Sequence, residues 1–354
     1  MISIPHTSAS RRAAYLSELA LGTERFHEPR REDCPWCGAQ RLRTRLRTTD
    51  LRRHQPGTFV VDECLDCGHA FQNPRLTAEG LAFYHLDFHE GHEGFAERIL
   101  AARGSRRRHR AAARAMLRFP EPESWLDVGT GHGHFPETAR EVHPYTAFDG
   151  VDLTVRVEKA REAGRVEEAH LGRLTDPELA ERLRGRYDVV SMFHHLEHAP
   201  DPREELRAAL AVLRPGGHLL VEVPDPACVF GTLLGKWWVS YGQPQHLHLM
   251  PLANLLAELT SLGFEVVSTD RREPHIPYDL TGAVSLLCAR LLPDIDAPWR
   301  AKPPTELQRL VRTALTRITV PFLAVASALD HALAPLLRRT RFSNTYRIIA
   351  RRIA

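Results

Sequence analysis

The sequence predicts an α/β protein with a doubly wound parallel sheet, a small metal-binding module before it and a helical insertion near its end. Strand-like and helix-like segments alternate through residues 119–270, the pattern of a parallel sheet with helices on both faces. A glycine-rich turn joins the first of these strands to a helix. Two Cys-x-x-Cys pairs lie upstream, and such pairs are typical of a zinc site.

Composition places the chain among soluble globular proteins. Of its 354 residues, 43% are apolar and 26% are charged. The formal net charge of +3 is too small to indicate a nucleic-acid-binding protein by itself. Four of the six cysteines fall in the two pairs, which suits a reducing compartment better than disulfides do. With no export-like N-terminal pattern, we expect a cytoplasmic protein.

We expect six segments along the chain. They are an N-terminal arm (1–30), a zinc ribbon (31–75), a helical cap (76–118), a ligand-binding core (119–270), a helical insertion (271–342), and a last strand with a short tail (343–354).

The ribbon is predicted from its cysteines. Cys34 and Cys37 are followed by Gly38, and Cys64 and Cys67 by Gly68, so each pair can close a tight turn. Four thiolates complete a tetrahedral Zn²⁺ site and leave no open position, which indicates a structural rather than catalytic metal. The alternative is two unrelated buried pairs.

The glycine turn follows Asp127 at the end of the first strand. Gly129, Gly131 and Gly133 alternate along it, and such a turn lets backbone N–H groups approach a ligand closely. A dinucleotide fingerprint would require glycine at position 134, where this chain has His134. A second acid, Asp152, ends the next strand. Each acid could alternatively be a helix N-cap.

Several motifs in order resemble the class I methyltransferases, which use S-adenosylmethionine (SAM). The closest likeness is to small-molecule enzymes with an N-terminal zinc ribbon, including the O-methyltransferases of the ubiquinone pathway. The resemblance implies a seven-stranded Rossmann-like sheet whose last strand, near residues 344–350, is antiparallel. The motifs are Leu126–Gly133, Gly150–Asp152, Tyr187–Val190, Leu196–Pro202, Leu213–Gly217 and Gln245–Leu249.

The resemblance also implies the cofactor contacts. Asp127 and the amides around Gly129, Gly131 and Gly133 would hold the methionine end of SAM, and Asp152 would accept the ribose hydroxyls. The adenine would lie near Gly172, although this loop matches the family poorly. Met192 and Phe193 would lie beside the methyl group.

Histidines gather around the expected acceptor pocket. Methyl transfer to a hydroxyl requires removal of its proton, so we expect His194 or His246 to act as the base, with His198 as a further candidate. His198 lies in a common family motif and also suits a structural role. On one helical turn, His194, Glu197 and His198 would instead suit a second, divalent metal.

The insertion contains an apolar run, Ile318–Leu329, which is shorter than the roughly 20 residues of a membrane-spanning helix. Arginines flank it. One interpretation is a set of buried helices forming a lid or dimer interface. The other is peripheral membrane contact through residues 312–341.

The sequence therefore predicts a SAM-dependent methyltransferase with a structural zinc. Its acceptor is a small molecule of natural-product, sugar or isoprenoid (lipid-like) type, with O-methylation favoured. An RNA methyltransferase is the alternative, supported by six arginines within residues 103–114 and opposed by the near-neutral charge. A binding module with a vestigial enzyme domain is a third. The acceptor and the oligomeric state are not predicted.

Overall fold

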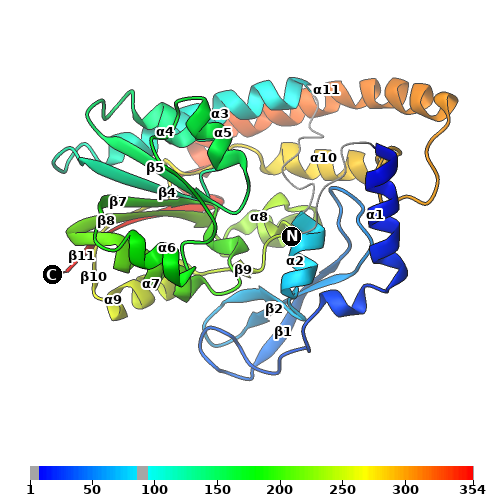
Figure 1. Ribbon diagram of the computed structural model, residues 1–354. Coiled ribbons are helices and arrows are strands. Elements are labelled where there is room, and N and C mark those ends of the chain that lie inside the picture. The colour runs from blue at the N-terminus through cyan, green and yellow to red at the C-terminus, as the bar shows by residue number, and fades with distance from the viewer. Residues whose placement is uncertain (1–7, 86–94, 354) are drawn as a thin grey trace. The chain divides into compact units, whose positions relative to one another are not determined.

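The computed structural model describes residues 8–85 and 95–353, and the chain forms two compact units (Figure 1). The first unit comprises Met1–Gly91, Cys228–Leu247 and Pro277–Leu337. The second comprises His92–Ala227, His248–Ile276 and Arg338–Ala354. Each unit is therefore built from three separate stretches of chain, and each is described by itself below.

A seven-stranded sheet forms the second unit, as the sequence predicts. The strands are β4 (Ser124–Val128), β5 (Ala147–Asp152), β6 (Ala169–Leu171), β7 (Tyr187–Phe193), β8 (Leu213–Pro224), β10 (Phe264–Asp270) and β11 (Thr345–Arg352). Their order is β10-β11-β8-β7-β4-β5-β6. Only β11 runs antiparallel to its neighbours, so the predicted antiparallel last strand is confirmed.

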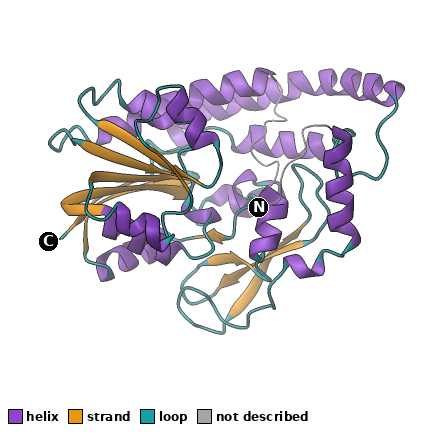
Figure 2. Cartoon of the chain, in the orientation of Figure 1, coloured by secondary structure: helices purple, strands orange, loops and turns teal. Residues whose placement is uncertain are grey.

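Helices cover both faces of this sheet (Figures 1 and 2). One face carries α3 (Phe95–Ala115), α4 (His134–Ala139) and α5 (Arg156–Glu162), and the other carries α6 (Pro177–Arg182), α7 (Pro202–Val212) and α9 (Leu252–Ser261). The start of α7 illustrates local sequence control. The Asp201 carboxylate accepts hydrogen bonds from the amides of Arg203 (2.8 Å) and Glu204 (3.3 Å), and Pro202 occupies the first turn.

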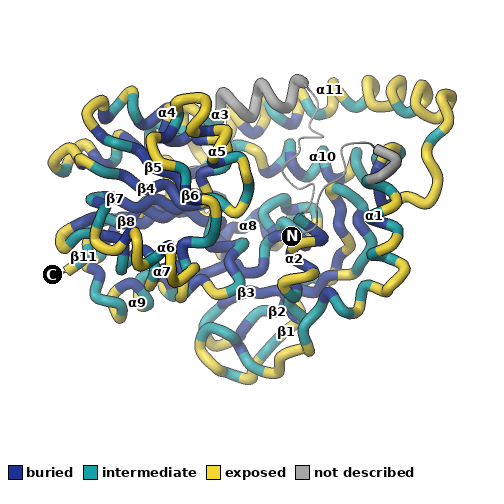
Figure 3. Tube along the Cα trace, in the orientation of Figure 1, coloured by how far each residue is buried: buried dark blue, intermediate teal, exposed yellow. Residues whose placement is uncertain are grey.

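Apolar strands form the core of the second unit. The strands carry near-continuous buried runs, as expected for parallel strands covered on both faces (Figure 3). Trp125 and Phe148, from the neighbouring strands β4 and β5, pack with their ring centroids 5.5 Å apart. This packing fixes the strands whose ends carry the predicted cofactor residues.

The first unit contains the cysteine module. Strands β1 (Leu42–Thr48), β2 (Phe59–Cys64) and β3 (Ala70–Gln72) pair antiparallel in that order. The first unit also contains short helices from before and after these strands: α1 (Ser8–Ala20), η1 (Glu24–Phe26), α2 (Ala78–His85), α8 (Val229–Leu233), η3 (Gly235–Trp237) and η4 (Val239–Tyr241). Strands β1 and β2 form an antiparallel hairpin between Cys37 and Cys67.

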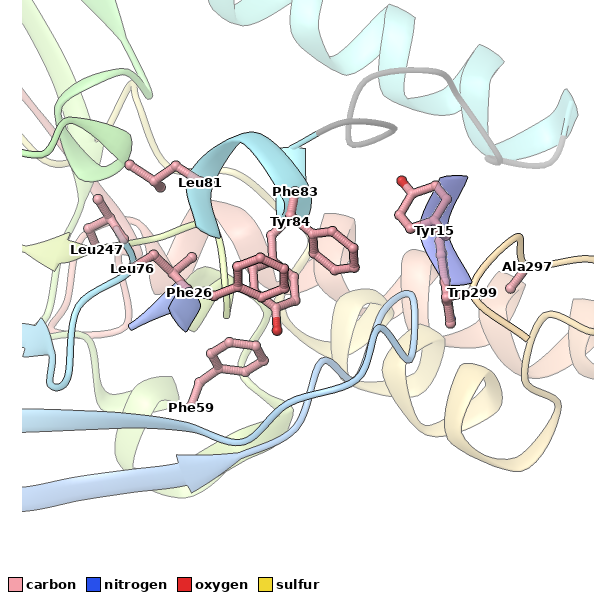
Figure 4. Packing of buried hydrophobic residues seen from close by; sticks show 10 residues of the cluster. All are labelled: Tyr15, Phe26, Phe59, Leu76, Leu81, Phe83, Tyr84, Leu247, Ala297 and Trp299. Carbon is pink, nitrogen blue, oxygen red and sulfur yellow. The ribbon is translucent and has the colours of Figure 1, made fainter. Parts of the chain in front are cut away.

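An aromatic cluster holds the first unit together (Figure 4). Phe26 stacks on Phe83 with ring centroids 4.7 Å apart, and Tyr15 packs edge-on against Phe83 at 5.3 Å and Trp299 at 5.7 Å. Trp299 lies more than two hundred residues from Phe83 in sequence, so this core packs the N-terminal stretch of the unit against its last stretch, residues 277–337.

Two helices form the predicted insertion between β10 and β11, namely α10 (Asp279–Leu291) and α11 (Glu306–Leu337). The sequence favoured an apolar segment ending at Asp330. Instead α11 continues through Pro321 and Asp330 for 32 residues. Buried Asp330 does not end the helix because its carboxylate accepts from the amides of Leu280 (3.0 Å) and Thr281 (2.8 Å), and so caps α10.

The predicted helical cap is divided between the units. Helix α2 belongs to the first unit and contacts η1, whereas α3 belongs to the second and packs on α4. The cap's residues 86–94 lie outside the described residues. Residues 228–247, predicted to lie within the core, belong to the first unit.

Candidate functional site

The register of the sheet brings the predicted cofactor residues to one edge. Val128, the last residue of β4, is paired with Val151 of β5 on one side and with Met192 of β7 on the other. Asp152 of β5 is paired with Leu171 of β6. The carboxyl ends of four strands therefore meet, and in an open α/β sheet this edge is where ligands bind.

The turn after β4 requires its glycines. Gly129, Gly131 and Gly133 have φ angles of 75°, 54° and 73°, in the left-handed region. A Cβ on Gly129 would lie 2.8 Å from Nδ1 of His195, and one on Gly133 would lie 2.9 Å from the Cβ of Arg165. At Gly131 the same position is open within 4 Å. Side chains therefore pack against the first and third glycines of the turn, and the middle glycine is open.

Asp152 is hydrogen-bonded to this turn. One carboxylate oxygen accepts from the Gly131 amide at 2.9 Å, and the other accepts from the amide and hydroxyl of Thr154 at 2.8 and 2.6 Å. A carboxylate offers about four lone-pair positions, so these three bonds leave room for a ligand hydroxyl. The alternative that the sequence leaves open, a helix N-cap, does not apply to Asp152, because Val155 occupies that position at the start of α5.

Asp127 is buried and has an internal partner. Its carboxylate is 3% exposed and accepts from the Ser191 hydroxyl at 2.6 Å, and that hydroxyl accepts from the Trp125 indole N–H at 2.9 Å. Burial raises the pKa of the Asp127 carboxyl to about 7, although the Ser191 hydrogen bond opposes the rise. A cationic ligand group would favour the ionised form.

Gly172 lies beside Asp152, because its amide donates to the Asp152 carbonyl at 3.0 Å. Its φ of 143° lies in a region that L-residues with a side chain rarely adopt, and a Cβ there would lie 2.9 Å from the Asp176 carboxylate, so the position favours glycine. The backbone hydrogen bond to Asp152 therefore holds the Gly172 loop at the carboxyl ends of the strands.

An apolar wall follows the end of β7. Met192 is fully buried, and the ring of Phe193 packs on Phe135 of α4 with centroids 4.4 Å apart. His109 of α3 packs edge-on against Phe135 at 5.8 Å. Burial lowers the pKa of His109 to about 3, so this ring is neutral and contributes apolar surface.

His194 has an unusual backbone and a buried acidic partner. Its φ is 50°, in the left-handed region that non-glycine residues rarely occupy. Its Nδ1 lies 3.0 Å from Oε1 of Glu197, which is fully buried, and its own Nε2 is buried without a hydrogen-bond partner among the described residues. Strained backbone of this kind clusters at functional sites.

The other histidines have different surroundings. His195 lies behind the glycine turn, 3.3 Å from Glu205; burial disfavours its charged form, but the Glu205 carboxylate raises its pKa. His198 ends the 3-10 helix η2 (Leu196–His198), so it does not continue an α-helical turn from His194. His246 belongs to the first unit, where its Nδ1 contacts the Ser240 carbonyl at 2.8 Å.

Ser191, Phe135 and His109 contribute to this site and were not predicted. Ser191 becomes visible only once the β4–β7 register is known, since Asp127 and Ser191 are paired in it. The Glu197 carboxylate was predicted as a metal ligand rather than as the partner of His194.

The four paired cysteines form a compact cluster in the first unit. Their Sγ atoms all lie within 4.8 Å of one another, with Cys34 and Cys67 at 3.7 Å and Cys37 and Cys64 at 3.6 Å. A zinc tetrahedron with bonds of about 2.3 Å has edges of about 3.8 Å. Gly38 and Gly68 adopt φ of 75° and 72°, as the predicted tight turns require.

The arginine run of residues 103–114 is partly neutralised. Arg106 and Arg110 both form ion pairs with Glu141, and Arg108 lies 3.9 Å from the buried Glu222. The described arginines therefore do not form one unpaired basic face. Arg103 has no described side chain.

Comparison with known proteins agrees with the fold. Residues 98–269 match the model of a methyltransferase domain family. The chain is 35% identical over 156 residues to a ubiquinone biosynthesis O-methyltransferase of Sodalis glossinidius (strain morsitans), covering 43% of this chain and 61% of that protein. It is 32% identical over 129 residues to the enzyme of the same name from Marinobacter nauticus (strain ATCC 700491 / DSM 11845 / VT8), covering 35% and 54%. The chain thus spans less than two thirds of these relatives.

Among solved structures, the chain is similar to a SAM-dependent methyltransferase from Archaeoglobus fulgidus, with a TM-score of 0.45 and 20% identity over 73% of this chain and 100% of the other. The match to the methyltransferase domain family covers just under half of the chain, and its residues 98–269 include six of the seven strands of the sheet.

Proposed function

We propose that this protein is a SAM-dependent methyltransferase acting on a small-molecule acceptor in the cytoplasm. The observation that carries the proposal is the Gly131–Asp152 hydrogen bond, which joins an open glycine turn to an acid at the next strand end. When bound, SAM supplies a methyl group already activated for transfer. The protein then needs to bind it, align an acceptor and exclude water.

Asp127, Asp152 and the three turn glycines form the proposed cofactor site. The amides around Gly129, Gly131 and Gly133 and the Asp127 carboxylate bind the methionine end, and Asp152 binds the ribose hydroxyls. Gly172 lies beside the adenine, and Met192 and Phe193 lie beside the methyl group.

His194 is the proposed general base, oriented by Glu197. A carboxylate can only accept, so the Glu197 contact keeps a proton on Nδ1 of His194 and leaves Nε2 able to take one. This favours O-methylation, because an acceptor hydroxyl must lose its proton. His246 and His198 become weaker candidates, since the structure gives His246 a contact within the first unit and places His198 in η2.

We further propose that Cys34, Cys37, Cys64 and Cys67 hold a structural Zn²⁺. Four cysteine Sγ atoms within 4.8 Å of one another are best explained by a cation that binds thiolates. With four thiolates its coordination is complete, so it takes no part in methyl transfer.

Helix α11 has the length and apolar composition of a membrane-spanning helix, but only 11% of its apolar stretch is buried. An exposed apolar helix of this kind supports a lipid-like acceptor. Exposed apolar residues recur about every 3.6 residues along α11 and so form one stripe on the helix. Asp330 binds α11 to α10, so we propose that α11 lies on a membrane surface and does not cross it. The stripe comprises Leu307, Val311, Leu315, Ile318, Phe322, Val325, Leu329, Leu333 and Leu336.

The RNA methyltransferase alternative has less support. Arg106 and Arg110 are engaged by Glu141, and the two ubiquinone-pathway relatives act, by name, in the biosynthesis of a small molecule.

SAM affinity should fall as pH decreases through about 7. Below the pKa of Asp127 its carboxyl is protonated and cannot pair with the cofactor's cationic end, so affinity should drop by up to about tenfold per pH unit. Calorimetry from about pH 8 to about pH 6 measures this. Asp127→Asn should bind weakly at every pH and Asp152→Ala more weakly than wild type, whereas Asp149→Asn should retain the wild-type pH dependence. A pH-independent wild-type affinity would contradict the role of Asp127.

His194→Gln should reduce turnover by roughly 10²–10⁴-fold while SAM affinity is unchanged. Release of S-adenosylhomocysteine with a dihydroxybenzoate probe measures turnover. Glu197→Gln, which still accepts from Nδ1, should cost less than Glu197→Ala. His331→Ala, at an exposed histidine of α11, serves as the control. Wild-type turnover in His194→Gln would eliminate this residue as the base.

Purified protein should contain one zinc per chain. Removing a thiolate leaves the metal incompletely bound, so Cys64→Ser should lose zinc and unfold the ribbon, and Cys288→Ser, outside the cluster, should do neither. Elemental analysis and thermal melting report the two effects. A stable wild-type protein without metal would refute the zinc proposal.

Wild-type protein should sediment with phospholipid vesicles. Replacing Ile318 and Phe322 by serine removes apolar area from the middle of the stripe and should weaken binding at least tenfold. Val320→Ser is the matched control, because Val320 is 57% exposed but lies off the stripe. Equal binding by all three proteins would leave α11 without a membrane role.

A further inference from the structure

A cavity lies in the second unit, at the ends of strands that do not contribute to the proposed cofactor site. It has a volume of about 770 Å³ and is bordered by residues that follow β8 and β10 and by the segment that leads into β11. This volume lies in the range of small-molecule pockets. Five of its lining residues are arginines: Arg271, Arg272, Arg338, Arg339 and Arg341.

The walls of this cavity are held together by hydrogen bonds. The Asn344 side chain accepts from the Ile276 amide at 3.0 Å and donates to the Ile276 carbonyl at 2.7 Å, and the Asn344 carbonyl accepts from the Asp225 amide at 2.9 Å. The Ser343 hydroxyl donates to the Arg271 carbonyl. The chain after β8, after β10 and before β11 is therefore fixed in one arrangement before any ligand binds.

Arginine charge exceeds acidic charge around the cavity. Asp225 is 2% exposed and accepts from Nε of Arg271 at 2.7 Å, which orients that guanidinium and leaves its terminal nitrogens available. Asp270 accepts from the Arg272 amide at 2.6 Å. Among the described residues, none forms an ion pair with Arg272, Arg338, Arg339 or Arg341.

Helix capping accounts for only part of this pattern. Arg338 and Arg339 directly follow α11, where cations are favourable beside the helix's last carbonyls. Arg271 and Arg272 follow a strand, and Arg341 lies beyond the first turn after the helix, so the same explanation does not apply to them. Like charges gathered around one cavity repel each other, and an anion bound between them relieves that repulsion.

We infer that this cavity binds a phosphate- or diphosphate-bearing ligand, separate from the proposed methyl-transfer site. Guanidinium groups bind phosphate oxygens through paired N–H donors, and several converging on one space suit a group with multiple negative charges. The phosphate could belong to a soluble phosphorylated molecule or to the headgroup of an anionic lipid. Both sources share the chemistry that the arginines recognise.

The test uses the full-length protein with two probes. Calorimetry with inorganic pyrophosphate tests soluble phosphates, and sedimentation with phosphatidylcholine vesicles, with and without phosphatidylglycerol, tests lipid headgroups. The variants are Arg272→Gln/Arg339→Gln, a second pair Arg338→Gln/Arg341→Gln, and the control Arg207→Gln, at an exposed arginine of α7 outside the cavity. Thermal melting confirms that each variant is folded.

Pyrophosphate binding that weakens about a hundredfold in either double variant, and is unchanged in Arg207→Gln, supports a soluble ligand, since each charged hydrogen bond contributes about tenfold or more. Absent pyrophosphate binding, a loss confined to phosphatidylglycerol vesicles in the double variants supports a lipid headgroup. The inference is overturned if wild type binds neither probe, or if folded double variants bind as wild type does.

Discussion

The hydrogen bond from the Gly131 amide to the Asp152 carboxylate is the contact on which the rest of the candidate site depends. It connects the turn after β4 to the end of β5, so the amides of the turn and the acid of the next strand are held in one geometry. The backbone reinforces it, because the amides of Gly129 and Thr130 both donate to the Val151 carbonyl. A ligand that meets this edge finds donors and acceptors already in place, and little ordering has to accompany binding.

Buried acids organise both units, but they do so by different means. In the second unit the Asp127 carboxylate accepts from the Ser191 hydroxyl, and the Glu197 carboxylate lies 3.0 Å from the imidazole of His194. In the first unit Asp330 is satisfied by the amides at the start of α10, and its role is purely to join two helices. The buried acids thus differ in their partners, which are side chains in the second unit and backbone amides in the first.

Sequence patterns predicted the parts of this structure that local chemistry determines. Strand β7 contains the motif Tyr187–Val190, and the sheet has the seven strands and the antiparallel last strand that the resemblance implies. Helix α11 extends well beyond the predicted apolar run Ile318–Leu329, and its Asp330 finds its partners in another helix, which no local signal reveals. In the sequence His194 and His246 were equal candidates for the base. The left-handed φ of His194 and its contact with Glu197 distinguish it, and both depend on the tertiary fold. The residue roles themselves stay predictions until measured.

The aromatic core of the first unit has a consequence for the order in which the protein is made. Leu247, Ala297 and Trp299 belong to the same buried cluster as Phe26 and Phe83, so that cluster closes only after about three hundred residues have left the ribosome. The cysteine module is synthesised first. The segment around Ala297 and Trp299, which completes the aromatic cluster, is synthesised only after six of the seven strands of the sheet. A fragment ending before residue 297 would retain the four cysteines and lack part of the aromatic cluster. Dividing this protein for expression at the boundary between ribbon and sheet would therefore separate segments that fold together.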